Sequence, residues 1–166
     1  NMLNLQEIAD IPGPTFTFNH NLPPHPPYVF DRDGNRLVGA SYDFVGIPTW
    51  RQTDLYVDEL IYLNKRLEET LDYILERSEV QPIIVIMADH GTRSTFSLVD
   101  PYHTPSDLRI HEGTAILHAF YLPDHCKSAP YPTITPVNSF RAIFDSCFGT
   151  DFGLLPDKTF WGSEID

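Results

Sequence analysis

An aspartate and a histidine stand side by side at the end of a strongly apolar segment. Asp89 and His90 directly follow the run Ile83 to Ala88 and precede Gly91. A turn at the glycine can bring the carboxylate and the imidazole onto one cation. This mixed oxygen and nitrogen donor set favours zinc or manganese over calcium or magnesium, which prefer oxygen ligands. In the alternative interpretation, Asp89 caps the following segment and His90 packs against it.

Basic side chains downstream of this pair are candidates for contact with an anionic substrate. Arg93 carries a guanidinium group that matches the oxygens of phosphate or sulfate, or else it pairs with one of the many carboxylates of the chain. His111 neighbours Arg109 and Glu112, so this trio forms either an anion clamp or a surface patch of salt bridges.

Two more histidines lie in the proline-rich amino-terminal part of the chain. Thr15 to Phe18 contains β-branched and aromatic residues, which predicts a short strand that delivers His20 and His25 to the loop at its end. Since His20 lies on the same loop as His25, it either orients His25 or touches substrate, unless it is simply a solvated loop residue.

The elements that must position these residues follow from the hydrophobic pattern. Apolar residues at three- and four-residue steps predict an amphipathic helix over residues 53–78, with Thr53 as its cap. The apolar run 83–88 predicts a central strand covered on both faces. A second buried strand is expected within 114–122 and a short helix over 138–147.

A long helix followed by a buried strand indicates an α/β fold. Ligands of such sheets bind beyond the carboxyl ends of the strands, which is where Asp89 and His90 stand. His118 falls inside the second predicted strand, so we expect it to be a core residue rather than a ligand.

The length and charge of the chain limit its possible partners. Its 166 residues fit one domain, and a net charge of −12 repels nucleic acid and anionic lipid surfaces. No apolar run approaches the roughly 20 residues that cross a bilayer. Cys126 and Cys147 lack metal-binding spacing and either pair with each other or are simply buried.

The order of these motifs resembles the alkaline phosphatase and sulfatase superfamily. The segment Phe18 to Tyr28, which contains His25-Pro26-Pro27, is similar to the His-Pro loop of that family, and Asp89-His90-Gly91 is similar to its Asp-His-Gly. The stretches 115–123 and 131–141 resemble the closing segment of bacterial sulfatase-like proteins. The resemblance covers roughly residues 15–158, which leaves 1–14 and 159–166 as tails.

The resemblance implies a fold and roles for individual residues. The expected fold is an alkaline-phosphatase-like, mostly parallel sheet flanked by helices, with residues 1–166 forming a partial domain. Asp89 and His90 would bind a catalytic divalent metal. His25 would face the anionic group of the substrate and take part in catalysis, and His103 lies where related enzymes place substrate-binding groups.

Two departures from the family pattern change this expectation. The residue after Asp-His-Gly is often acidic in the family, whereas here it is Thr92, followed by Arg93. A Thr, Ser or modified Cys nucleophile near the start of the domain has no counterpart here, and neither Cys126 nor Cys147 is followed by the arginine of the sulfatase motif. We therefore expect this chain to be a carboxyl-terminal half whose amino-terminal half is missing.

The expected function is a metal-dependent hydrolase of sulfate or phosphate esters. The alternatives are a phosphoethanolamine or glycerophosphate type of transferase, a catalytically inactive sulfatase-like binding module, or an unrelated α/β domain in which Asp-His-Gly is only a turn. By resemblance, the domain works in the periplasm or outside the cell, and a membrane anchor belongs only to a longer parent protein.

Overall fold

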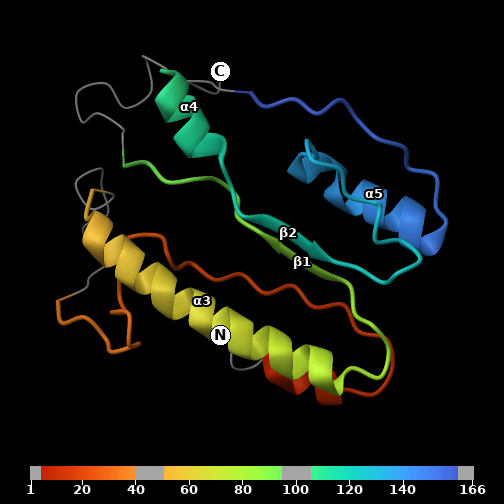
Figure 1. Ribbon diagram of the computed structural model, residues 1–166, viewed down its shortest axis with the longest axis horizontal. Coiled ribbons are helices and arrows are strands. Elements are labelled where there is room, and N and C mark those ends of the chain that lie inside the picture. The colour runs from red at the N-terminus through yellow and green to blue at the C-terminus, as the bar shows by residue number, and fades with distance from the viewer. Residues whose placement is uncertain (1–4, 40–50, 95–105, 161–166) are drawn as a thin grey trace. The chain divides into compact units, whose positions relative to one another are not determined.

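The computed structural model describes residues 5–39, 51–94 and 106–160. In chain order, its elements are η1, α3, β1, α4, β2 and α5 (Figure 1). The described residues mix helix and strand, so the expected α/β class holds in a loose sense. They divide into two compact units, one running up to Glu79 and including Arg93, the other containing residues 80–92 and everything from Ser106 onward.

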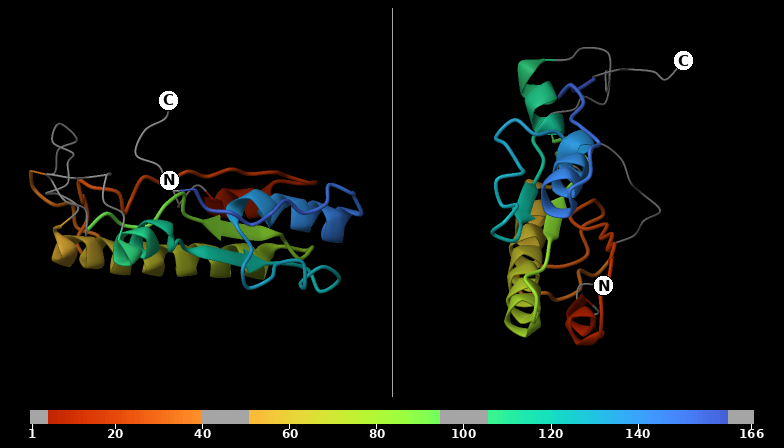
Figure 2. Two further views of the ribbon diagram at one scale, coloured as in Figure 1. Left: turned by 90° about the horizontal axis from the view of Figure 1, so that it is seen from above. Right: turned by 90° about the vertical axis from the view of Figure 1, so that its right-hand side faces the viewer.

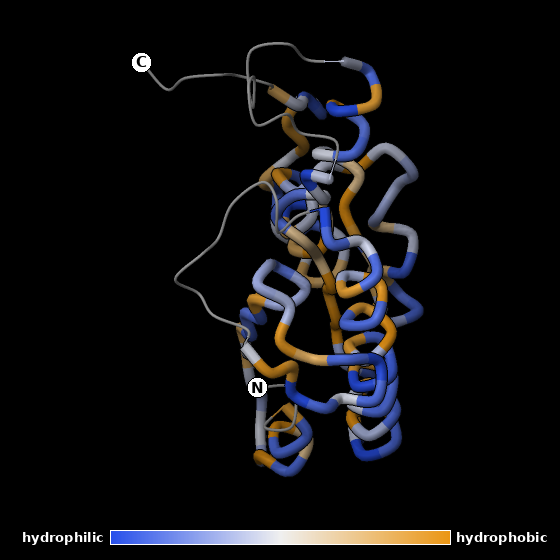
Figure 3. The backbone as a smooth tube through the Cα atoms, turned by 90° about the vertical axis from the view of Figure 1, so that its left-hand side faces the viewer, coloured by the Kyte–Doolittle hydropathy of each residue, from blue (hydrophilic) through white to orange (hydrophobic). Residues whose placement is uncertain are grey.

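The first unit is built around one long helix, α3, which spans Thr53–Arg77. Its bounds agree with the predicted 53–78, and Figure 3 shows the alternation of hydrophilic and hydrophobic residues that produced the prediction. The predicted cap is wrong, since the N-cap residue is Gln52 and the Thr53 hydroxyl donates to the Arg51 carbonyl at 3.4 Å.

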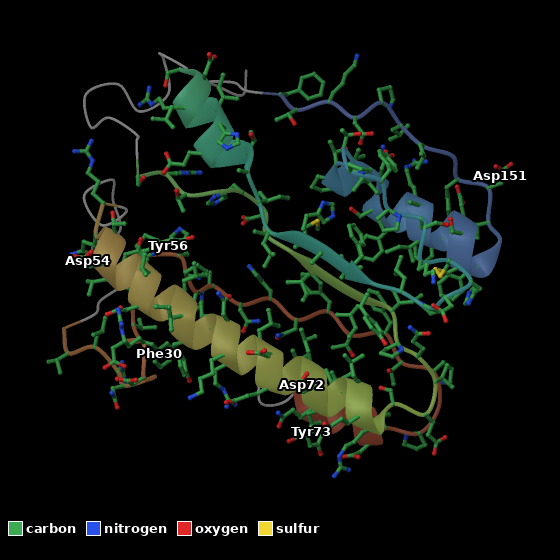
Figure 4. All side chains as sticks on the ribbon, in the orientation of Figure 1. Phe30, Asp54, Tyr56, Asp72, Tyr73 and Asp151 are labelled. Atoms are coloured by element: carbon green, nitrogen blue, oxygen red, sulfur yellow. A yellow bond between two sulfur atoms is a disulfide. The ribbon has the colours of Figure 1, made fainter. Side chains whose placement is uncertain are left out.

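A short 3-10 helix, η1 (Gln6–Asp10), lies against α3. The Arg77 guanidinium donates to Asp10 at 3.2 Å and also stacks 4.7 Å from the centre of the Tyr73 ring. Further along the first unit, the ring of Phe30 packs 5.1 Å from that of Tyr62, and Figure 4 shows Phe30 beside α3. These contacts hold the segments that precede α3 onto the helix.

The strand predicted for Thr15 to Phe18 is wrong, because this segment has no strand partner in the described ranges. Phe16 and Phe18 are each 82% exposed, so their β propensity is not supported by packing against neighbours. A turn forms nearby, at residues 31–35. Asp31 accepts hydrogen bonds from the backbone of Asp33 and Asn35, and it closes a narrow hairpin.

The second unit contains the only paired strands among the described residues (Figure 1). Strand β1 (Ile84–Met87) pairs antiparallel with β2 (His118–Tyr121), with Val85 opposite Phe120. Both predicted strands are therefore confirmed, but the mostly parallel sheet is not shown. Residues of β1 are only partly buried and Met87 is exposed, so the strand is less covered than its sequence predicts.

Helix α5 (Pro136–Phe148) confirms the second predicted helix and begins after Thr135. Cys126 and Cys147 form a disulfide, which decides between the two alternatives left open by the sequence. Cys126 lies in a hydrophobic core with Leu122 and Ile143, packed against Val85 and Phe120 of the sheet. The disulfide thus links the turn after β2 to the end of α5.

A third helix, α4 (Asp107–Thr114), is not among the elements predicted from the sequence. The Ser106 hydroxyl caps it by accepting from the Arg109 backbone amide. Both views in Figure 2 show the chain passing directly from α4 into β2. None of the helices in the described ranges has the length and apolar character needed to cross a bilayer.

Candidate metal site

Asp89 and His90 extend from the end of β1 and lie next to each other. Oδ2 of Asp89 is 3.8 Å from Nε2 of His90. The other carboxylate oxygen, Oδ1, accepts the backbone N–H of His90 at 3.0 Å. The Asp89 side chain is 88% exposed and that of His90 is 34% exposed, so a solvated ion can reach both.

The tautomer of His90 follows from its ring contact. Nδ1 lies 2.7 Å from the carbonyl oxygen of Gly91. A carbonyl only accepts, so Nδ1 carries the proton and Nε2 bears the lone pair in the neutral ring. Metal-binding histidines commonly donate their other ring N–H to a backbone carbonyl in this way.

The separation of the two side chains fits a shared divalent cation. Ligand atoms that each lie about 2.0–2.2 Å from one zinc ion are at most about 4.4 Å apart, and Oδ2 and Nε2 meet that condition at 3.8 Å. A cluster of three or more His, Cys, Asp or Glu side chains suited to a metal does not occur within residues 5–39, 51–94 and 106–160. Asp89 and His90 are therefore two candidate ligands, and further ligands would have to complete the site.

Backbone hydrogen bonds hold the Asp-His pair on both sides. The amide of Ala88 donates to Leu117 at 3.0 Å, and the amide of Gly91 donates to Gly113 at 2.9 Å. Gly91 is required here because a Cβ atom would stand 1.8 Å from the carbonyl oxygen of Glu112. The end of α4 and the chain that follows it thus form the support of the pair.

Thr92 connects the same turn to α4 through side chains. Its hydroxyl donates to Oε1 of Glu112 at 2.5 Å. Sequence reasoning missed this contact, because it placed Glu112 in a trio with Arg109 and His111. In the structure, Arg109 is buried and His111 is exposed, and the anion clamp stays a prediction.

The other predicted substrate contacts are distributed over the chain. His20 and His25 belong to the first unit, as does Arg93, whereas Asp89, His90 and His111 belong to the second. Within the second unit, the side chains of Asp89 and His90 contact each other. His103 lies outside the described residues.

His25 is partly buried in the proline-rich segment of the first unit. Its Nδ1 lies 2.6 Å from the carbonyl oxygen of Pro26, and its backbone amide donates to Leu22 at 2.9 Å. The exposed ring of His20 lies 6.4 Å from the ring of Phe18, and its role beside His25 stays a prediction.

The segment that follows His25 is attached to α3 by a buried carboxylate. Glu59 is fully buried, and its Oε1 accepts the backbone N–H groups of Val29 at 2.8 Å and Phe30 at 3.2 Å. Burial raises the pKa of Glu59 despite these two bonds. Burial likewise raises the pKa of the neighbouring Tyr28 hydroxyl to about 12, with smaller contributions from Tyr56 and Glu59.

Comparison with known proteins adds no relatives: no family model, curated protein or solved structure matches this chain.

Proposed function

We propose that this chain is part of a metal-dependent hydrolase of sulfate or phosphate esters, in which Asp89 and His90 bind the metal. The observation that carries the proposal is the paired geometry of Oδ2 and Nε2, 3.8 Å apart, with Nδ1 of His90 donating to a backbone carbonyl. The proposal also includes an amino-terminal half that completes the site and a larger, mostly parallel sheet that contains β1.

In this proposal, the residues of this chain have the following roles. A bound zinc or manganese ion supplies Lewis-acid polarisation of an ester oxygen. Asp89 and His90 would hold it, and Arg93, whose guanidinium group matches the oxygens of such an anion, remains a predicted substrate contact. His25, whose Nδ1 lies 2.6 Å from the carbonyl oxygen of Pro26, remains predicted to face the anionic group of the substrate. His20, His103 and His111 remain predicted substrate contacts.

The disulfide supports a location in the periplasm or outside the cell. Cys126 and Cys147 are paired, and disulfides form and persist mainly in oxidising compartments.

A second candidate, motivated by the missing nucleophile motif, is a sulfatase-like binding module without catalysis. Both cysteine sulfurs are consumed by the bond, so neither is available as a precursor of a sulfatase nucleophile. In this alternative the Asp-His pair holds a cation that only binds an anionic ester. Turnover by the full-length gene product distinguishes the two candidates.

Metal binding is tested first, with Mn²⁺ as a paramagnetic probe in amide NMR spectra of the chain. We expect broadening centred on residues 88–92, and its loss in the Asp89→Ala/His90→Ala double variant. The chain offers a matched control in Asp124 and His125, an adjacent and exposed Asp-His pair in the same unit. Asp124→Ala/His125→Ala should leave the broadening unchanged. Broadening that is absent, or centred on residues 124–125, contradicts the proposed metal site.

Catalysis is tested with the full-length gene product, using 4-nitrophenyl phosphate and 4-nitrophenyl sulfate in the presence of Zn²⁺ or Mn²⁺. We expect hydrolysis of one ester and its loss on Asp89→Ala. Metal binding without hydrolysis of either ester would support the binding module instead. Hydrolysis that persists at full rate in Asp89→Ala would exclude Asp89 as a ligand of the catalytic metal.

A further inference from the structure

Thr92 directly follows Asp89-His90-Gly91, and the structure places a carboxylate beside it from another element. Glu112 lies 20 positions downstream on α4, and its Oε1 accepts the Thr92 hydroxyl at 2.5 Å. Hydrogen bonds to an ionised acceptor are short and stronger than those between neutral groups. The two residues therefore form a direct side-chain link between the metal-site turn and α4.

The link is one of three attachments that reach the same short turn. Gly91 donates to the Gly113 carbonyl and has no room for a side chain next to the carbonyl oxygen of Glu112. On the other side of the pair, Ala88 donates to Leu117. Asp89 and His90 thus lie between anchored neighbours, and the backbone of Gly91 in turn supplies the carbonyl oxygen that fixes the His90 tautomer.

We propose that Glu112 is a positioning residue for the Asp89–His90 metal pair, acting through the Thr92 hydroxyl on the turn that carries the pair. This inference rests on the proposed metal site. Groups that orient metal ligands from outside the coordination sphere typically change affinity 10- to 100-fold when removed. The proposed effect of Glu112 passes through Thr92, so it must disappear when the Thr92 hydroxyl is removed.

The test compares variants that keep or remove this hydrogen bond. Thr92→Val preserves the shape of the side chain and removes its hydroxyl, whereas Thr92→Ser keeps the hydroxyl. Glu112→Leu removes the acceptor, whereas Glu112→Gln keeps a neutral acceptor oxygen. The dissociation constant for Mn²⁺ is measured by titration of amide broadening at residues 88–92. The ring nitrogen spectrum of His90 reports its tautomer in the same samples.

We expect Thr92→Val and Glu112→Leu each to weaken Mn²⁺ binding about 10-fold, with a smaller loss in Thr92→Ser and Glu112→Gln. The Thr92→Val/Glu112→Leu double variant should bind no worse than the weaker single variant, because both remove one interaction. We also expect the Nδ1–H form of His90 to become less populated in the weakened variants. Thr92→Val keeps the test decisive if Glu112→Leu does not fold.

Failure of the inference differs from failure of the proposed function. If the unaltered chain shows no Mn²⁺ broadening at residues 88–92, the metal site itself is wrong and the inference falls with it. If the unaltered chain binds Mn²⁺ and Thr92→Val binds equally well, the metal site stands and the role of Glu112 is overturned. Additive losses in the double variant would also overturn it, because the two residues would then act separately.

Discussion

The backbone N–H of Val29 donates to Oε1 of Glu59 over 2.8 Å, from a loop to the buried face of α3. Phe30 donates to the same oxygen, while Oε2 of Glu59 and the hydroxyl of Tyr28 are both buried without a hydrogen-bond partner in the described part of the chain. One carboxylate oxygen therefore anchors the segment that follows His25, and the other is held in a site that disfavours charge.

Glu59→Gln should remove a pH-dependent loss of stability in the first unit. Burial raises the pKa of Glu59, so the unfolded chain ionises this group at lower pH than the folded chain does. The contribution of Glu59 to the free energy of unfolding is therefore fully present below the ordinary carboxyl pKa. It is lost as the pH rises through the raised pKa that Glu59 has in the folded chain. Urea unfolding of both proteins from pH 4 to pH 8 should show a stability difference that grows with pH in favour of Glu59→Gln.

Two further variants show whether the effect is specific to the ionisation of Glu59. Glu68→Gln alters an exposed carboxyl on the same helix. Its free energy of unfolding should change with pH in the same way as that of the unaltered chain. Glu59→Ala should destabilise the unit by about 1–3 kcal/mol for each backbone N–H left without its acceptor. Parallel curves for Glu59→Gln and the unaltered chain would show that Glu59 ionises as freely in the fold as outside it.

Asp157→Asn should release the extended segment that follows α5. Asp157 accepts from the Thr135 hydroxyl, the Tyr131 hydroxyl and the Thr135 amide, and these bonds lower its pKa to about 2. The contribution of Asp157 to the stability of the fold is present above the ordinary Asp pKa and is lost as the pH falls towards 2. The Leu155 amide, which donates to Asn138, should exchange faster with solvent in the variant at pH 6.

Asp151→Asn provides the control, since Asp151 is an exposed residue of the same segment (Figure 4). It should leave the exchange rate of the Leu155 amide unchanged. Equal rates in all three proteins would mean that Asp157 does not hold the segment in place.

Gly91→Ala should displace the metal pair without unfolding the sheet. The added methyl group would stand 1.8 Å from the carbonyl oxygen of Glu112, so the backbone must move. Overpacking of this kind costs about 1–3 kcal/mol. We expect Mn²⁺ broadening at residues 88–92 to disappear while cross-strand contacts between Val85 and Phe120 persist. Retention of both signals would show that the turn tolerates a side chain.

Ser139→Ala should destabilise the second unit by about 1 kcal/mol. Ser139 is fully buried on α5, and its hydroxyl lies 2.8 Å from Nε2 of His118 on β2. Chemical unfolding measures the loss, and Ser146→Ala, an exposed position on the same helix, should have almost no effect. Burial lowers the pKa of His118. The contribution of His118 to the free energy of unfolding is therefore present at neutral pH, and it declines as the solution is acidified below the ordinary histidine pKa.

Elements with a strong local signal could be predicted from the sequence. The long apolar stripe of α3 and the apolar run of β1 each encode their own conformation, and the position of Asp89 and His90 at a strand end followed directly from the latter. Helix α4 was missed because its eight residues are too few to establish a period and contain Gly113, which favours helix weakly. The capping residue Ser106 was the one local signal that could have revealed it.

Contacts between residues that are far apart in the sequence could not be predicted, because they produce no local sequence pattern. Glu59 is a charged residue near the beginning of α3, yet it is buried because the loop containing Val29 folds back on that helix. The link between Thr92 and Glu112 depends on α4, and it could not be predicted without that helix. The strand predicted at Thr15 failed for a related reason, because a strand is stabilised by a partner that its own sequence does not specify.

The Cys126–Cys147 bond closes a ring of chain that includes the approach to α5 and nearly all of that helix. Cleavage of the backbone anywhere inside this ring would leave both products covalently joined. Such a nicked molecule would migrate as one species in a denaturing gel until a reducing agent separated it into two.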